Sequence, residues 1–286
     1  MTAKISIVIP AKNEAHGLQS LLPAIGAICP EAEVVVIDDG SHDETVAICR
    51  QNNVRVISHP HSLGNGAAVK TGARAAQGAI MLFMDADGQH QPQDIPRLLE
   101  KLNAGYDMVV GARGNGSQAG MHRSLANGFY NRLATWMVGH KVADLTSGFR
   151  AVRAEKFRKF LYLLPNGFSY PTTITMGFFR AGYPVAYVPI HAPKRIGKSH
   201  LRIARDGVRF LLIIFRVGTL YSPLKIFFPI SLLFMLLGLG NYLHSFLTIH
   251  RFTNMSALLF IASILIFLIG LVSEQITSLN YRDSER

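Results

Sequence analysis

Apolar and polar residues alternate in blocks along the first two thirds of the chain. Five short apolar runs have the length of buried strands and are bounded by glycine, proline or polar residues: Ile5–Ile9, Glu33–Ile37, Val54–Ser58, Ala79–Met84 and Met108–Val110. Segments between them carry apolar residues at helical spacing: Glu14–Cys29, Gly66–Ala76 and Asp94–Leu102. Strands that alternate with helices predict a parallel α/β sheet covered on both faces.

The pattern is less regular beyond Gly111. Helices are predicted over Ser124–Val138, Thr172–Ala181 and Leu201–Leu220, and a strand over Val185–Ile190. The intervening segments 113–121, 144–150 and 165–171 are predicted to be loops or turns. The segment 201–220 carries four arginines at spacings of three, four and seven residues. This pattern favours an amphipathic helix at the level of lipid headgroups over a solvated face of an ordinary helix.

The last third of the chain contains two long runs without a charged residue, 226–243 and 255–272. Each run is about as long as a helix needs to cross a bilayer. Both are apolar on all sides, which favours membrane spans over a pair of buried core helices. We therefore expect two membrane-spanning helices near the C-terminus.

The net charge of +11 is concentrated ahead of the first apolar run. Eight basic residues lie between 194 and 225, whereas the connection between the runs holds only Arg251 and two histidines. The positive-inside rule then places the N-terminal domain and the tail from Glu274 in the cytoplasm. Cys29 and Cys49 fit a reducing compartment, and no cleavable signal is expected before the first strand. These charges lack interleaved aromatic motifs, so anionic lipid is expected as their partner and nucleic acid is not.

Polar residues gather where the predicted strands end, and ligands bind parallel sheets at those ends. Lys12–Glu14 follows the first strand, Asp38–Asp39 the second and Asp85–Asp87 the fourth. Asp85 and Asp87 point the same way, and two like charges on one face favour a divalent cation that takes oxygen ligands. A polar loop that caps the next helix is the alternative. In either case His90 is expected to be a helix-start residue, not a metal ligand.

The stretch Gly64–Gly72 has glycines spaced superficially as in a dinucleotide-binding turn. It follows the third strand, however, and no acidic residue is suitably placed about 20 residues further on. We expect instead a tight loop that opens a helix packed close to the sheet, and contact of this loop with a phosphate or ribose is the alternative.

Six motifs together resemble, in order and spacing, the inverting family 2 glycosyltransferases of GT-A fold. The motifs are 9–14, 38–43, 64–72, 85–90, 147–150 and 195–199. Within that family the chain resembles the dolichyl-phosphate mannose synthase and polyprenyl-phosphate glycosyltransferase branch, especially members with a C-terminal membrane hairpin. The resemblance implies a GT-A (Rossmann-like, mostly parallel) domain over 1–200, an amphipathic interface helix over 201–224, two transmembrane helices over 225–273 and a cytoplasmic tail over 274–286.

The resemblance also implies an activity and its partners. The activity is transfer of a sugar, with inversion, from a UDP- or GDP-linked donor to undecaprenyl or dolichyl phosphate at the cytoplasmic membrane face, with Mg²⁺ or Mn²⁺ as cofactor. An oligomer through the membrane helices is compatible with it. A processive polysaccharide synthase is disfavoured, because its Gln-x-x-Arg-Trp motif is absent and two spans are few for a channel. A non-catalytic scaffold or lectin-like module with this fold is expected to lose its acidic metal ligands, and both aspartates are present.

Site residues follow from the resemblance position by position. The nucleotide-sugar site is expected to comprise Pro10, Ala11, Asn13, Glu14, Asp38, Asp39, Asp85, Ala86, Arg195 and Ser199. The metal ligands are expected to be Asp87 and Gln89, and the acceptor-phosphate ligands Arg113, Arg123 and Asn127, the last standing where a serine is common. The catalytic group is expected to be Asp87, Arg113, Arg123 and Arg202.

A phosphate acceptor determines whether the site must supply a general base. A phosphate monoester has a second pKa of about 6 and is already an oxyanion at neutral pH, so no general base is required. Asp144 is then either a base or a structural residue of its turn, and the second role is favoured.

Overall fold

The computed structural model describes residues 4–114, 121–167, 169–191, 218–219 and 221–282, apart from the side chains of 121–127, 129 and 280–282. The chain divides into two compact units, Met1–Leu201 and Arg202–Arg286. The finer boundaries at 200, 224 and 273 stay predictions. The amphipathic helix expected over 201–220 lies almost entirely outside the described residues.

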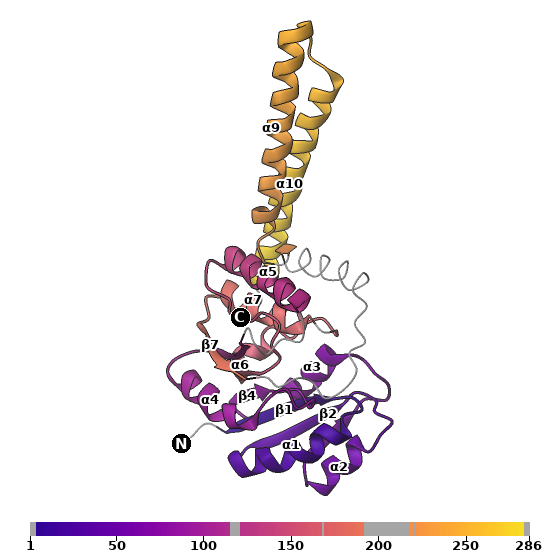
Figure 1. Cartoon of the computed structure of the whole chain (residues 1–286), viewed down its shortest axis with the longest axis vertical. Helices are drawn as coiled ribbons and strands as arrows, with labels where there is room; N and C mark the ends of the chain where they lie inside the picture. Colours follow the sequence, from indigo (N-terminus) through magenta and orange to yellow (C-terminus); the bar gives the residue numbers. More distant parts are fainter. Residues whose placement is uncertain (1–3, 115–120, 168, 192–217, 220, 283–286) are drawn as a thin grey trace. The chain divides into compact units, whose positions relative to one another are not determined.

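A seven-stranded sheet forms the centre of the first unit, in the order β3-β2-β1-β4-β6-β5-β7 (Figure 1). The strands are β1 (Ile5–Ala11), β2 (Glu33–Asp38), β3 (Arg55–Ser58), β4 (Ile80–Phe83), β5 (Met108–Arg113), β6 (Arg150–Arg153) and β7 (Val185–Ile190). All neighbouring pairs are parallel except those of β6, which runs antiparallel to β4 and β5. The prediction of a mostly parallel α/β domain is confirmed.

Helices cover both faces of this sheet (Figure 1). They are α1 (Ala15–Ile28), α2 (Thr45–Gln51), α3 (Asn65–Ala75), α4 (Ile95–Asn103), α5 (Met121–Val138), α6 (Ala154–Arg158) and α7 (Tyr170–Arg180), with a 3₁₀ turn η1 (Pro92–Asp94) before α4. Ile7 and Ile9 of β1 belong to one buried cluster with apolar residues of α1 and α4. Val8 points to the opposite face, where it meets α3 at Gly72. Side chains of a buried parallel strand are thus apolar on both faces.

Three short elements were not expected from the sequence pattern: β6, α2 and the five-residue helix α6. Strand β6 begins and ends with an arginine, so it lacks the apolar run that marks a strand; it forms because β4 and β5 both offer hydrogen-bonding edges to it. Helix α2 spans only seven residues, too few for a clear period. The predicted turn over 144–150 therefore leads into a central strand of the sheet.

The second unit contains two long helices, α9 (Pro223–Ile249) and α10 (Asn254–Arg282), which pack against each other as an antiparallel hairpin (Figure 1). Small residues recur every seventh position on their facing sides and are buried: Ser231, Gly238 and Ser245 on α9, and Ser256, Ser263, Gly270 and Thr277 on α10. A seven-residue repeat of small side chains lets two helices approach closely along their whole length.

Hydrogen bonds reinforce this hairpin. Ser231 Oγ donates to the Ser263 carbonyl at 2.9 Å, and Ser263 Oγ donates to the Ser231 carbonyl at 2.8 Å. Near the turn, Asn241 Oδ1 accepts from the hydroxyls of Thr253 and Ser256 at 3.0 and 2.8 Å. The polar groups of the facing sides are therefore satisfied within the hairpin, which a lipid environment requires.

The outward sides of the hairpin carry large apolar residues. Both helices are long and apolar enough to cross a membrane, and only 11% and 17% of the residues in their most apolar windows are buried. Core helices of a globular protein would be mostly buried, so the pattern favours membrane spans. The tail expected from Glu274 begins inside α10, which continues to Arg282. Glu274 accepts a hydrogen bond from the Leu224 amide in the first turn of α9.

The close contact between α3 and β1 generates a first prediction. A methyl group at Gly72 would lie 2.2 Å from Val8 Cγ1, so Gly72→Ala is expected to lower the free energy of unfolding by about 1–3 kcal/mol. Gly26→Ala in α1 is the control, because a Cβ there meets nothing within 4 Å and alanine is favoured over glycine in a helix by up to about 1 kcal/mol. In urea unfolding followed by circular dichroism, the midpoint of Gly72→Ala should lie below that of wild type and the midpoint of Gly26→Ala above it. Equal midpoints for the two variants would contradict the contact between α3 and β1.

Candidate functional site

A cavity of about 460 Å³ opens at the carboxyl ends of the central strands. Its lining includes seven of the residues expected at the nucleotide-sugar and metal sites: Pro10, Ala11, Glu14, Asp39, Asp85, Ala86 and Asp87. The other lining residues had no individual assignment, although several belong to the strand-end clusters and motifs named above: Lys12, Ser62, Gly64, Asn65, Ala68, Thr146, Gly148, Tyr170 and Pro171. Most of the latter come from the glycine-rich start of α3 and from two segments beside β6, whose place in the sheet was not foreseen.

Strand order arranges the lining in a row. Because β2, β1, β4 and β6 are successive neighbours, Asp39 comes first, then Pro10–Lys12, then Asp85–Asp87, and last Thr146–Gly148. The antiparallel direction of β6 matters here, since it brings the start of that strand to the edge where the parallel strands end. Neighbouring strands lie about 4.8 Å apart, so the row extends over about 15 Å.

At the β2 end of the cavity, one carboxylate organises a whole loop. Asp39 Oδ1 accepts from His59 Nδ1 and the Leu63 amide, both at 2.8 Å. Its Oδ2 accepts from Ser62 Oγ at 2.7 Å and the Gly64 amide at 2.9 Å. Burial alone would raise the pKa of Asp39, but these donors together hold it at about 2. Asp39 is thus an ionised anchor for residues 59–64, which lead into α3.

Two other residues expected at the nucleotide site form the support of this end. Asn13 adopts a left-handed conformation with φ of 55°, and its Oδ1 accepts from the His42 amide at 2.8 Å. Asp38 is buried and accepts from the Ser41 amide at 2.9 Å. Neither residue is among those that line the cavity. Their contacts interlock the loops that follow β1 and β2.

The loop after β4 carries Asp85 and Asp87 into the cavity. Gly17 of α1 allows the close approach of this loop, because a Cβ there would lie 1.9 Å from the Ala86 carbonyl oxygen. Asp87 Oδ1 accepts a hydrogen bond from the backbone N–H of Gln89 at 3.1 Å. Asp85 and Asp87 therefore belong to a tight turn whose backbone is fixed on the α1 side.

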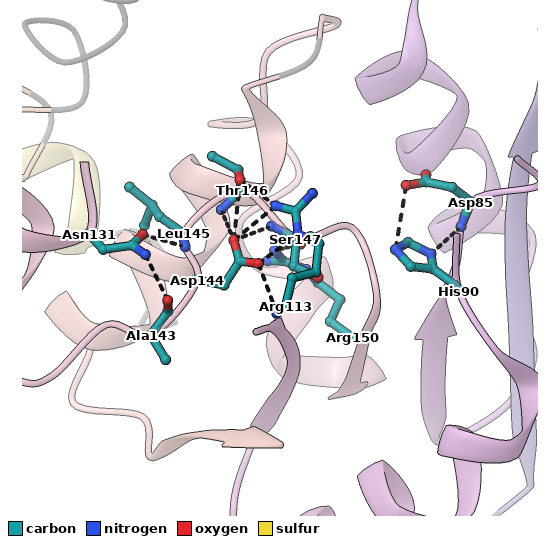
Figure 2. Close-up of polar contacts among 10 residues, drawn as sticks. All are labelled: Asp85, His90, Arg113, Asn131, Ala143, Asp144, Leu145, Thr146, Ser147 and Arg150. Atoms are coloured by element: carbon teal, nitrogen blue, oxygen red, sulfur yellow. Dashed lines mark hydrogen bonds and ion pairs between the residues drawn. The ribbon is translucent and has the colours of Figure 1, made fainter. Parts of the chain in front are cut away.

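His90 supports this turn through a hydrogen bond to its backbone. The expectation that His90 starts a helix is therefore wrong. Its ring is buried, stacks on Phe149 at a centroid distance of 5.0 Å, and accepts from the Asp85 amide through Nδ1 at 2.8 Å (Figure 2). Burial lowers the pKa of His90 to about 4. The imidazole is thus neutral at pH 7, with its proton on Nε2, and acts as an acceptor for the backbone of the turn.

The donor set fits a hard divalent cation. Asp85 and Asp87 line the cavity as carboxylates, and the amide oxygen of Gln89 is two residues further on. Within the described residues no three histidine, cysteine or acidic side chains cluster into a complete cage. Mg²⁺ is commonly held by one or two carboxylates plus substrate phosphates, so the residues present fit a cation that arrives with a diphosphate.

Arg113 and Asp144 form a bidentate ion pair beside the cavity (Figure 2). Arg113 Nε donates to Asp144 Oδ2 at 2.8 Å and its Nη2 to Oδ1 at 3.0 Å. The amides of Thr146 and Ser147 also donate to Asp144. Burial would raise the pKa of Asp144, but Arg113 and the backbone N–H of Thr146 lower it. The favoured structural role of Asp144 is supported, and the guanidinium expected at the acceptor phosphate is partly committed to this pair.

The turn that contains Asp144 is also tied to α5, a contact that the sequence did not suggest. Asn131 Nδ2 donates to the Ala143 carbonyl at 2.7 Å, and its Oδ1 accepts from the Leu145 amide at 3.0 Å (Figure 2). The remaining expected residues lie outside the described part: the side chains of Arg123 and Asn127, and all of Arg195, Ser199 and Arg202.

The four donors on Asp39 generate a prediction about stability and pH. Asp39→Asn should lower the free energy of unfolding by on the order of 2 kcal/mol at pH 7, because the loop loses a charged acceptor. The native pKa of about 2 lies below the unfolded value of about 3.9. The stabilisation is therefore present above about pH 4 and is lost as the pH falls through 2. Denaturant titrations at several pH values should show the difference between wild type and variant shrinking over that window.

The exposed Glu31 offers a control, since Glu31→Gln is expected to leave stability within about 0.5 kcal/mol of wild type. A difference between wild type and Asp39→Asn that stays constant from pH 7 to pH 2 would contradict the ionised anchor.

Known proteins match both parts of the chain. The family model Glycosyl transferase family 2 matches residues 6–161, and the model GtrB C-terminal hairpin matches residues 222–279. Polyprenol monophosphomannose synthase of Mycolicibacterium smegmatis is 28% identical over 234 residues, covering 73% of this chain and 88% of that protein. Dolichyl-phosphate hexose transferase of Haloferax volcanii is 31% identical over 200 residues, covering 69% and 86%.

A solved structure shares the fold. Glucosyl-3-phosphoglycerate synthase from Mycobacterium tuberculosis, in complex with Mn²⁺, UDP-glucose and phosphoglyceric acid, superposes with a TM-score of 0.63 at 22% identity, over 76% of this chain and 79% of that one. This likeness concerns the fold alone. The sheet with its cavity at the strand ends, the terminal hairpin and the two family models agree: the chain belongs to glycosyl transferase family 2 and carries a GtrB-type C-terminal hairpin.

Proposed function

We propose that this protein transfers a sugar from a nucleotide-diphosphate sugar to a polyprenyl phosphate at the cytoplasmic face of a membrane. The observation that carries the proposal is the pairing of two features in one chain: a strand-end cavity lined by Asp39, Asp85 and Asp87, and a hairpin of two apolar helices. Relatives that match more than two thirds of the chain are named for polyprenol- and dolichyl-phosphate substrates.

The row of cavity residues suggests how the donor lies. The nucleoside is assigned to the ends of β2 and β1, beside Asp39, Pro10 and Ala11. The diphosphate is assigned to the end of β4, beside Asp85 and Asp87, and the sugar to the side of Thr146 and Gly148. This direction brings the negative diphosphate to the two carboxylates that need a cation, and it leaves the polar and aromatic groups near β6 for the sugar.

A cation is assigned to Asp87 and Gln89. These residues would hold Mg²⁺ or Mn²⁺, and the ion would supply positive charge to neutralise the departing diphosphate. The chain's own contribution is to hold the turn that carries the two carboxylates. His90 accepts a hydrogen bond from the backbone N–H of Asp85, and the backbone N–H of Gln89 donates to the Asp87 carboxylate. The turn is thereby organised before substrate arrives, which is the condition for effective electrostatic stabilisation.

The proposed reaction is a single displacement. An oxygen of the polyprenyl phosphate forms a bond to C1 of the sugar, the bond from C1 to the diphosphate oxygen breaks, and the nucleoside diphosphate leaves with both electrons of that bond. Attack opposite to the leaving group inverts C1. The phosphate needs no base, in keeping with an Asp144 whose oxygens accept from Arg113 and from the Thr146 and Ser147 backbone N–H groups, which makes it a weak base.

The hairpin and the basic segment before it suggest the location of the reaction. Two apolar helices joined by a short turn place both of their outer ends on one side of a bilayer. The excess of lysine and arginine before α9 favours the cytoplasm for that side. The catalytic domain and both chain ends are then cytoplasmic, where nucleotide sugars are made.

The test is an acceptor and donor screen. Membranes that contain the protein are incubated with radiolabelled UDP- and GDP-sugars and with undecaprenyl or dolichyl phosphate, with and without EDTA. We expect a chloroform-soluble labelled product from at least one donor, and its loss in EDTA. Label that stays water-soluble with every donor, while the membranes hold folded protein, would contradict the proposal.

Asp87→Asn tests the cation site. The variant should lose at least about 10³-fold in kcat, as expected for removal of a group that stabilises developing charge, while its thermal unfolding stays close to that of wild type. Asp94→Asn is the control, because Asp94 forms an ion pair with Arg97 outside the cavity. Substantial turnover by Asp87→Asn with Mn²⁺ present would remove Asp87 from the site.

Arg123→Ala tests the acceptor site. If Arg123 contacts the lipid phosphate, the variant should raise KM for polyprenyl phosphate by roughly tenfold or more, the loss expected for a charge-assisted hydrogen bond, with little change in KM for the donor. Arg132→Ala changes an exposed arginine on the same helix and should leave both values unchanged. Equal increases for donor and acceptor in Arg123→Ala would count against this assignment.

A further inference from the structure

A buried arginine lies behind the β6 end of the cavity. Arg150 opens β6 and has no exposed surface. Its Nη1 donates to the Pro171 carbonyl and to Thr175 Oγ1, both at 3.2 Å, and its Nη2 donates to the Ser147 carbonyl. Its guanidinium also faces the Tyr170 ring, 5.9 Å from the centroid. Within the described residues no carboxylate forms an ion pair with it.

Stability alone does not account for this arginine. A buried charge loses its hydration, and replacing it by a well-packed apolar side chain is often neutral or stabilising. Among the residues that the structure describes, Arg150 Nε has no hydrogen-bond partner, and the same is true of Ser147 Oγ and the Tyr187 hydroxyl, both buried. Buried polar groups are usually satisfied, so an incompletely satisfied cluster calls for a role other than stabilisation.

The two carbonyl groups that Arg150 binds belong to two different walls of the cavity. Ser147 precedes Gly148, which lines the cavity and lies so close to Asp85 that a Cβ at position 148 would be 2.9 Å from Asp85 Oδ2. Pro171 lies in the first turn of α7 and lines the cavity together with Tyr170. Figure 2 shows Arg150 next to the turn that contains Ser147. One rigid guanidinium therefore sets the spacing between these walls.

A guanidinium suits this task better than an ammonium. Its donors are held in a planar fork, so two acceptors on separate segments are fixed in distance and angle at once. We call the contacts of Arg150 with the Ser147 and Pro171 carbonyl groups the brace. Thr175 strengthens the brace, because its hydroxyl donates to the same Pro171 carbonyl at 2.8 Å. The brace involves none of the groups assigned to the nucleoside or the diphosphate.

We propose that Arg150 is a positioning residue that fixes the width of the sugar end of the cavity, and that it thereby determines which donor sugar fits. The inference rests on the proposed function, in which the sugar lies beside Gly148 and Tyr170. Arg150 touches no substrate; it acts through Ser147–Gly148 on one wall and Tyr170–Pro171 on the other.

The experiment uses the full chain in detergent and three variants. Arg150→Lys keeps the charge but loses the fork, and Thr175→Val removes the bracing hydroxyl with little change of shape. Arg153→Lys is the matched control, because Arg153 ends the same strand and donates to the Leu102 carbonyl, far from the cavity lining. For each protein, titration calorimetry in Mn²⁺ gives the affinity for UDP or GDP, whichever wild type binds, and for the matching nucleotide sugar. Turnover is measured with that sugar and with its C4 epimer.

Arg150→Lys should bind the plain nucleoside diphosphate within about threefold of wild type, since that end of the cavity is unchanged, a difference of less than 1 kcal/mol. Its kcat/KM for the preferred donor should fall by on the order of 10²-fold, the loss expected when a reacting group is misplaced by about 1 Å. The ratio of kcat/KM for the preferred donor to kcat/KM for its C4 epimer should decrease at the same time. Thr175→Val should shift in the same direction by less, and Arg153→Lys should match wild type.

Unchanged donor preference and unchanged kcat/KM in both Arg150→Lys and Thr175→Val would overturn the inference. A parallel loss of affinity for the plain diphosphate would also overturn it, because it would indicate general damage to the cavity. Failure of the proposed function looks different. In that case wild type itself gives no lipid-linked product, whereas a loss of sugar affinity in Arg150→Lys, relative to diphosphate affinity, still supports the brace.

Discussion

The structure depends on how negative charge is held at one edge of the sheet, at the ends of β2 and β4 and before the start of β6. Asp39 is bound by four donors, and Asp144 is bound by Arg113 and two amides. These contacts fix both outer carboxylates to the protein itself. Asp85 and Asp87 lie between them and line the cavity, in a turn that His90 supports through its backbone. The site thus contains carboxylates that the protein's own donors hold in place and, between them, the turn to which we assign a cation.

The two units of the chain solve the problem of buried polar groups in different ways. In the first unit, side-chain carboxylates and a buried guanidinium bind backbone groups of loops, which have no regular partners of their own. In the second unit, small residues at seven-residue intervals bring two helices together, and serine hydroxyls bond to carbonyl groups across the interface. The first arrangement shapes a ligand cavity, and the second leaves large apolar side chains along most of the outward sides of the hairpin.

Much of the fold could be predicted from the sequence because the parallel strands are continuous apolar runs and the helices have a clear period. The position of Asp39, Asp85 and Asp87 at one edge followed from the strand ends. Strand β6 could not be predicted, because Arg150–Arg153 carries no strand pattern and pairs only through its neighbours. The places of Gly148 and Tyr170 in the cavity lining, and the contacts of Arg150 behind it, depend on the position of β6. They could therefore not be predicted either. Asn13 was assigned to the nucleotide from the family resemblance and His90 to a helix start, whereas both side chains accept hydrogen bonds from backbone N–H groups that tertiary structure brings to them.

The central claim is that a donor lies along the row from β2 to β6 with its diphosphate at the end of β4. Anomalous diffraction from crystals of the full chain with Mn²⁺ and the nucleoside diphosphate that it binds would test this directly. The account predicts one strong manganese peak at about 2.2 Å from an Asp87 carboxylate oxygen, as for other oxygen-ligated divalent ions, with the nucleoside beside Asp39. A manganese peak away from Asp87, or a nucleoside beside Gly148 and Tyr170, would contradict it.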